Sequence, residues 1–79
     1  MNEWLSARAD ALAQAGGTKR DSLELTAAES ETLLDLAALA AHESGARANA
    51  PLLCYLLGRA SAGGASLDEL AAAVRASTS

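Results

Sequence analysis

Large side chains other than leucine are scarce in this sequence. Its 79 residues include no phenylalanine and no isoleucine, and only one valine, one tryptophan and one tyrosine. The hydrophobic fraction of 51% is mostly alanine and leucine, and alanine favours helices while burying little area. A bulky core must therefore come from the leucines together with Trp4, Tyr55 and Val74. A domain this small with so few large side chains is marginally stable, and self-association is a common remedy.

Cysteine and basic residues are also rare. Cys54 is the only cysteine, which excludes an internal disulfide, whereas small secreted domains usually need several. Six basic residues against ten acidic ones give a net charge of −4, which disfavours nucleic acid and anionic membranes as partners. Residues 1–4 do not begin a signal peptide, and no apolar run reaches transmembrane length. We therefore expect a cytoplasmic protein.

The sequence has apolar residues at helical spacing. It lacks the period-two alternation that indicates strands. It predicts a single compact all-α domain over residues 1–79, with four helices at about 3–15, 27–43, 51–62 and 67–76 and a frayed tail from about 76. The expected boundary residues are Asn2, Gly16 and Gly17 around the first helix, the capping boxes Thr26–Glu29 and Ser66–Glu69 before the second and fourth, and Asn49, Ala50 and Pro51 at the start of the third.

The first predicted helix places Trp4, Leu5, Ala9 and Leu12 on one face at 100° per residue. Arg8 falls inside this face, one helical turn after the tryptophan, and we expect its guanidinium over the indole ring. The polar segment 17–25 that follows predicts a mobile loop anchored by its two leucines.

The second and fourth predicted helices each have an apolar arc that faces inward. These arcs consist of Leu33, Leu36, Ala37, Ala40 and Ala41 in the second helix, with Leu34 at the edge, and of Leu67, Leu70, Ala71 and Val74 in the fourth. Glu31, Asp35 and His42 lie opposite the first arc. Acids early and a histidine late in a helix suit its dipole, so these charges need no functional role.

The third predicted helix has two apolar faces. They consist of Leu52, Leu53, Leu56 and Leu57, which span an arc of about 140°, and of Pro51, Cys54, Tyr55 and Gly58 on the other side. Such a helix is either central in its own domain or half-covered by a partner, and both alternatives stay open. We take the leucine arc as core and the second set as the candidate interaction surface for a protein partner or a homodimer.

Few side chains are candidates for chemistry. His42 has no metal ligand three or four residues away, and Cys54 lacks a Cys-His-acid pattern, so we expect a helix-end histidine and a small buried hydrophobe. The run Gly-Gly-Thr-Lys at 16–19 lacks the strand and glycine spacing of a phosphate-binding loop. Arg47 either closes the turn before the third helix or binds an anion, which makes His42 and Arg47 a candidate polar site. We expect no catalytic residues, metal or cofactor.

One serine suggests a different function. The tripeptide Asp21-Ser22-Leu23 in a short acidic helical chain resembles acyl carrier proteins, whose serine carries a phosphopantetheine arm. In that family the serine opens the second helix after a long first loop. Here the capping box at Thr26 starts the next helix after the tripeptide, so a carrier function through Ser22 is kept only as an alternative.

A longer resemblance centres on the segment Arg47–Gly58. Its arginine, its Asn-Ala-Pro-Leu run and its Tyr-Leu-Leu-Gly end resemble a small family of uncharacterised helical domains from high-GC Gram-positive bacteria. Leu34–Ala37, Ala41–His42, the early tryptophan and Leu67–Leu70 also fit, so the resemblance covers most of the chain. That family occurs alone or attached to proteins resembling molybdenum-cofactor guanylyltransferases. The resemblance implies an accessory role near molybdenum-cofactor biosynthesis and carries over no catalytic residue.

Three hypotheses follow from the sequence. The first is a non-enzymatic accessory or protein-interaction module that forms a dimer or a stable complex. The second is a binder of a small anionic ligand, such as a pterin nucleotide, that uses His42 and Arg47. The third is the carrier protein with Ser22 as its attachment site.

Overall fold

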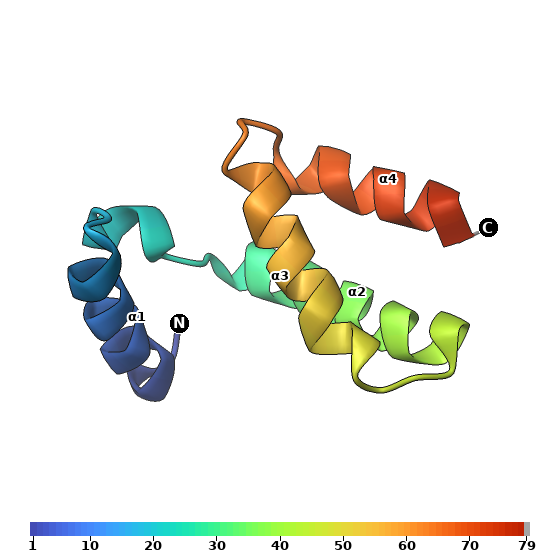
Figure 1. Ribbon diagram of the computed structural model, residues 1–79, viewed down its shortest axis with the longest axis horizontal. Helices are drawn as coiled ribbons and strands as arrows, with labels where there is room; N and C mark the ends of the chain where they lie inside the picture. The colour runs from blue at the N-terminus through green and yellow to red at the C-terminus, as the bar shows by residue number, and fades with distance from the viewer. Residues whose placement is uncertain (79) are drawn as a thin grey trace. The chain divides into compact units, whose positions relative to one another are not determined.

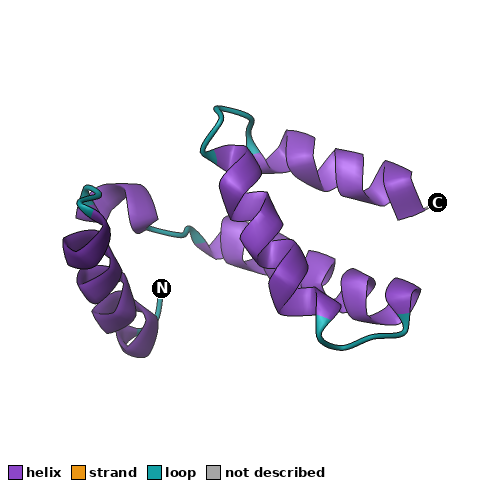
Figure 2. Ribbon diagram, viewed as in Figure 1, coloured by secondary structure: helices purple, strands orange, loops and turns teal. Residues whose placement is uncertain are grey.

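The computed structural model describes residues 1–78 and is built of helices joined by short turns (Figures 1 and 2). Its α-helices are α1 (Glu3–Gly16), α2 (Ala27–Ser44), α3 (Asn49–Ser61) and α4 (Leu67–Thr78), and a 3₁₀ helix, η1 (Arg20–Leu23), lies between α1 and α2 in the chain. The predicted all-α class with four α-helices is confirmed. Within residues 1–78, no helix has the length and apolarity needed to cross a membrane.

The chain divides into two units, one of residues 1–30 and one from Glu31 onward, with the boundary after the first turn of α2. In the first unit η1 packs against α1, and the buried residues are Ala9 and Ala13. The prediction that Trp4 and the leucines supply the core is therefore wrong for Trp4 and Leu12, which are 65% and 64% exposed. The 3₁₀ turn approaches α1 over small side chains, which leaves the large ones uncovered.

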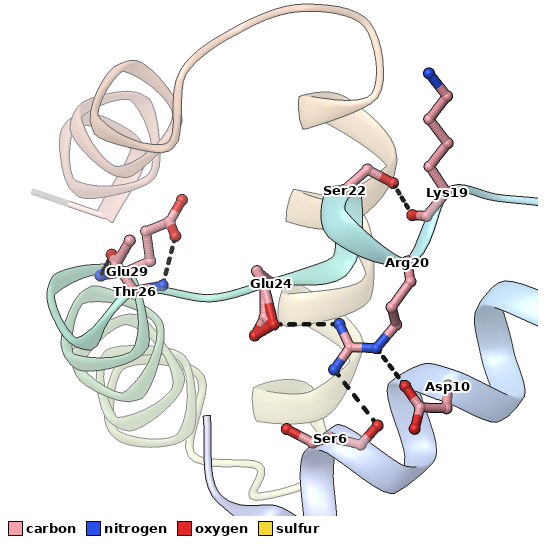
Figure 3. A network of polar contacts seen from close by, with 8 residues as sticks. All are labelled: Ser6, Asp10, Lys19, Arg20, Ser22, Glu24, Thr26 and Glu29. Atoms are coloured by element: carbon pink, nitrogen blue, oxygen red, sulfur yellow. Dashed lines mark hydrogen bonds and ion pairs between the residues drawn. The ribbon is translucent and has the colours of Figure 1, made fainter.

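Arg20 holds η1 to α1 (Figure 3). Its Nε donates to Asp10 Oδ1 at 2.6 Å, and its other nitrogens donate to Glu24 Oε2 at 3.2 Å and to the Ser6 carbonyl oxygen at 3.5 Å. The Asp10 hydrogen bond, helped by the charge of Glu24, raises the pKa of the Arg20 guanidinium above its ordinary value. The segment expected as a mobile loop is thus folded from Arg20 to Leu23 and tied to the preceding helix.

The core of the second unit joins α2, α3 and α4 through the buried residues Leu36, Leu57 and Ala71. Leu33, Leu53, Leu70 and Val74 pack against this cluster, which confirms the inward position of Leu33 and Leu36 in α2 and of Leu70, Ala71 and Val74 in α4. Leu34, expected at the edge of the arc of α2, is instead 72% exposed. In α3 only half of the leucine arc is used, because Leu52 and Leu56 are 60% and 58% exposed. They lie 100° around the helix from Leu53 and Leu57, and the core takes only that second pair. Tyr55 also stays outside the core.

The helix ends agree with the sequence except in α3 and α4. The Asn2 side chain accepts a hydrogen bond from the Leu5 N–H at 2.9 Å, and Gly17 ends α1 with a φ of 65°. Ser66 Oγ accepts from the Glu69 N–H at 3.2 Å at the start of α4. These caps were predicted.

Helix α3 begins at Asn49, two residues before the predicted start, and its N-cap Ala48 offers no side-chain hydrogen bond. The N–H groups of Asn49 and Ala50 donate to the carbonyl oxygens of Ala46 and Arg47 at 3.0 and 3.1 Å. A helical turn therefore precedes Pro51, so Asn49 and Ala50 lie inside the helix rather than capping it.

Helix α4 continues to Thr78, past the tail that was expected to fray from about 76, while Ser79 lies outside the described residues. The hydroxyls of Ser77 and Thr78 donate to the carbonyl oxygens of Val74 and Arg75 at 2.7 and 3.1 Å. These bonds satisfy carbonyl groups that a helix end otherwise leaves to water.

Candidate functional site

An open apolar groove runs across the unit that begins at Glu31. It lies between the C-terminal half of α2, the N-terminal half of α3 and the end of α4, and its volume is about 510 Å³. Five apolar side chains give the groove its character: Leu39, Leu52, Leu53, Leu56 and Val74. A concave site of this size and polarity is typical of surfaces that take an apolar ligand or the apolar face of a helix.

The leucine pairs of α3 make this groove. Leu53 packs on the core cluster, as does Val74, so both tie the groove to the interior. Leu52 and Leu56 are one helical turn apart and mostly exposed, so they offer apolar area that the unit itself does not cover. The sequence placed all four leucines in the core. Two of them, Leu52 and Leu56, instead lie mostly exposed along the groove.

Polar side chains complete the lining. Ser44, Asn49, Ser77 and Thr78 border the groove, and Glu43 is the only charged side chain among the described residues that line it. A single carboxylate beside an apolar groove favours an occupant with an apolar stripe and one basic group.

The predicted interaction surface lies on another side of α3. Pro51, Tyr55 and Gly58 are exposed, whereas Cys54 is half-buried with a free thiol. The guanidinium of Arg59 stacks over the Tyr55 ring at 4.7 Å from its centroid. Three of the four residues are therefore accessible, and the aromatic ring among them already has an arginine on one face.

The candidate polar site consists of two exposed side chains. His42 lies in the last turn of α2 and Arg47 in the turn that follows, and neither side chain has a hydrogen bond or an ion pair within residues 1–78. Ser44 closes this turn instead, since its Oγ donates to the Ala40 carbonyl oxygen at 2.6 Å and accepts from the Ala46 N–H at 3.2 Å. Ser44, rather than Arg47, therefore closes the turn between α2 and α3.

Ser22 lies within η1 rather than at the start of α2, and its Oγ donates to the Lys19 carbonyl oxygen at 2.6 Å (Figure 3). This geometry gives the carrier alternative no support. Within residues 1–78, no three His, Cys, Asp or Glu side chains are grouped so that they could hold a metal ion.

A second uncovered apolar surface lies on α1. It consists of Trp4, Leu5 and Leu12, and we call it the α1 face. Arg8 stacks over the Trp4 ring at 4.8 Å from its centroid, as predicted, so a basic group lies within this face. Sequence reasoning found the members of this face but assigned them to the interior.

Comparison with known proteins gives one match. A family described as a domain of unknown function matches residues 1–79, the full length of the chain, in agreement with the expected family of uncharacterised small domains. No match was found among curated proteins or among solved structures.

Proposed function

This chain belongs to the DUF6457 family, a domain of unknown function, and we propose that it is a non-enzymatic accessory module that binds another polypeptide through the groove of α2, α3 and α4. The observation that carries the proposal is the pair Leu52 and Leu56, which leaves two leucines more than half exposed beside a concave apolar site. Leaving such area in water is unfavourable, and covering one leucine contributes about 2 kcal/mol.

The groove indicates the chemistry of its partner. Its apolar lining comes from three helices, which suits an amphipathic helix with anchors three to four residues apart. Glu43 at its border favours a partner helix with a basic residue next to those anchors. Tyr55 and Pro51 lie on the same helix and extend the exposed surface beyond the groove.

The cellular setting of the module is part of the proposal. We propose that it works in the cytoplasm, and the single cysteine, which cannot form an internal disulfide, supports this location. The resemblance to domains attached to guanylyltransferase-like proteins supports a role beside molybdenum-cofactor biosynthesis. A protein of that pathway is then the first partner to test.

The test is an affinity pull-down from native cells with matched variants. Leu56→Glu places a charge in the groove, whereas Leu34→Glu makes the same change at a leucine of α2 that is 72% exposed and outside it. We expect Leu56→Glu to abolish recovery of the partner and Leu34→Glu to retain it. Equal recovery with both variants would refute the groove as the binding surface.

A second candidate function rests on Arg47. Ser44 closes the turn after α2, and the Arg47 guanidinium has no protein partner within residues 1–78. Arg47 lies five residues after His42, whose side chain is also exposed. Such a pair suits a small anionic ligand such as a pterin nucleotide. A thermal shift with anionic nucleotides that is lost in Arg47→Ala and His42→Ala tests this candidate. No shift with the unsubstituted protein removes it.

A further inference from the structure

Residues 1–30 bury no large side chain of their own. Ala9 and Ala13 are the buried residues of this unit, while Trp4 and Leu12 of the α1 face are about two-thirds exposed. A segment of this length cannot build a stable core from two alanines. The α1 face therefore needs an apolar surface to cover it.

The α1 face and the groove are both apolar, and they are complementary in charge. Trp4, Arg8 and Leu12 recur at four-residue intervals, which places them along one stripe of α1 as the anchors of a helix in a groove. Arg8 is the only basic residue of α1, and Glu43 is the only charged side chain among the described residues that line the groove. Both surfaces are thus apolar, and each has a single charge of the sign opposite to that of the other.

We propose that the groove is occupied by the α1 face of a second copy of this chain, with Arg8 of one protomer facing Glu43 of its partner. This inference rests on the proposed function and names the polypeptide that the groove binds. Two copies can exchange their α1 faces reciprocally. The resulting dimer is closed, with both grooves and both α1 faces covered.

The α1 of a second copy and the chain's own α1 carry the same residues, so the test of the proposal has to tell these two occupants of the groove apart.

Charge reversal separates the two arrangements. The variants Arg8→Glu and Glu43→Arg each place like charges across the proposed interface, and we expect each to raise the dimer dissociation constant roughly fivefold in sedimentation equilibrium. An equimolar mixture of the two should form heterodimers with the affinity of the unsubstituted protein, because every contact then joins opposite charges. The matched control mixes Arg75→Glu with Asp35→Arg, which change the same charges outside both surfaces and should alter nothing.

Three results would overturn the inference. They are a monomeric unsubstituted protein at all concentrations, a dimer indifferent to these variants, and restoration only when both changes lie in one chain. The last result would show that the chain's own α1 occupies the groove.

If the protein is monomeric and Leu56→Glu still abolishes partner recovery, the inference fails and the proposed function stands. If Leu56→Glu alters neither dimer nor partner recovery, both fail. Circular dichroism of each variant verifies that helices are retained.

Discussion

Thr26 and Glu29 hydrogen-bond each other reciprocally at the start of α2. The Thr26 Oγ1 accepts from the Glu29 N–H at 3.0 Å, and the Glu29 Oε1 accepts from the Thr26 N–H at 2.8 Å. Two backbone N–H donors are thereby satisfied just before the boundary between the two units, which lies after Ser30. The helix that carries one wall of the groove therefore begins at a fixed residue.

Removing this cap should weaken α2. We expect Thr26→Ala to lower the free energy of unfolding by about 1 kcal/mol, because a first-turn N–H loses its acceptor. Thr18→Ala is the matched control, since Thr18 is exposed and its hydroxyl makes no hydrogen bond within residues 1–78. Urea unfolding followed by circular dichroism measures both. Equal stability of the two variants would contradict the role of the cap.

The burial of Leu36 should dominate the stability of the unit from Glu31 onward. Leu36 is fully buried, and we expect Leu36→Ala to cost about 3 kcal/mol through lost transfer energy and the cavity left behind. Leu34→Ala, two residues away and 72% exposed, should change stability by less than about 0.5 kcal/mol. Chemical denaturation of both variants decides the point, and a comparable loss in Leu34→Ala would mean that Leu34 is covered in solution.

Two adjacent glycines should respond in opposite directions to alanine. Gly17 has a φ of 65°, so Gly17→Ala should destabilise the end of α1 by about 1 kcal/mol. Gly16 lies inside the helix, and a Cβ there meets only Thr18 Oγ1 at an ordinary 3.5 Å. Gly16→Ala should therefore be neutral or stabilising by up to about 1 kcal/mol. Thermal unfolding of the pair measures the difference, and the reverse order would rule out this C-cap.

Loss of the Arg20 side chain should release η1 while leaving the α-helices formed. In Arg20→Ala the contacts to Asp10, Glu24 and the Ser6 carbonyl are absent, so the amide protons of Ser22 and Glu24, which bond within η1, should exchange faster. Lys19→Ala removes a neighbouring positive charge whose side chain makes no such contact. Hydrogen exchange by NMR compares them. Unchanged exchange in Arg20→Ala would show that other packing holds η1.

The local signals in the sequence predicted most of the helix boundaries. The capping box of Thr26, the Asn2 cap and the left-handed Gly17 depend only on neighbours along the chain, so they could be recognised without the fold. The start of α3 was misplaced because Pro51 suits a first turn but does not exclude a helical turn before it.

The faces of α1 and α3 could not be predicted from periodicity alone. A 100° wheel shows that Leu52 and Leu53 are both apolar, but not which of them the core admits, since tertiary packing decides that. The 3₁₀ helix η1 is held by the contact of Arg20 with Asp10, ten residues earlier in the chain. No local sequence motif predicts this contact. The groove was missed for the same reason, because its exposed leucines were counted as core.

The stacked pairs Arg8–Trp4 and Arg59–Tyr55 have a spectroscopic consequence. The only tryptophan belongs to residues 1–30 and the only tyrosine to the part that begins at Glu31, so each unit contains its own chromophore. Tryptophan emission follows the first unit and tyrosine absorbance the second, without any label. Coincident transitions of the two signals mean cooperative unfolding, whereas separate transitions resolve the stability of each unit in one sample.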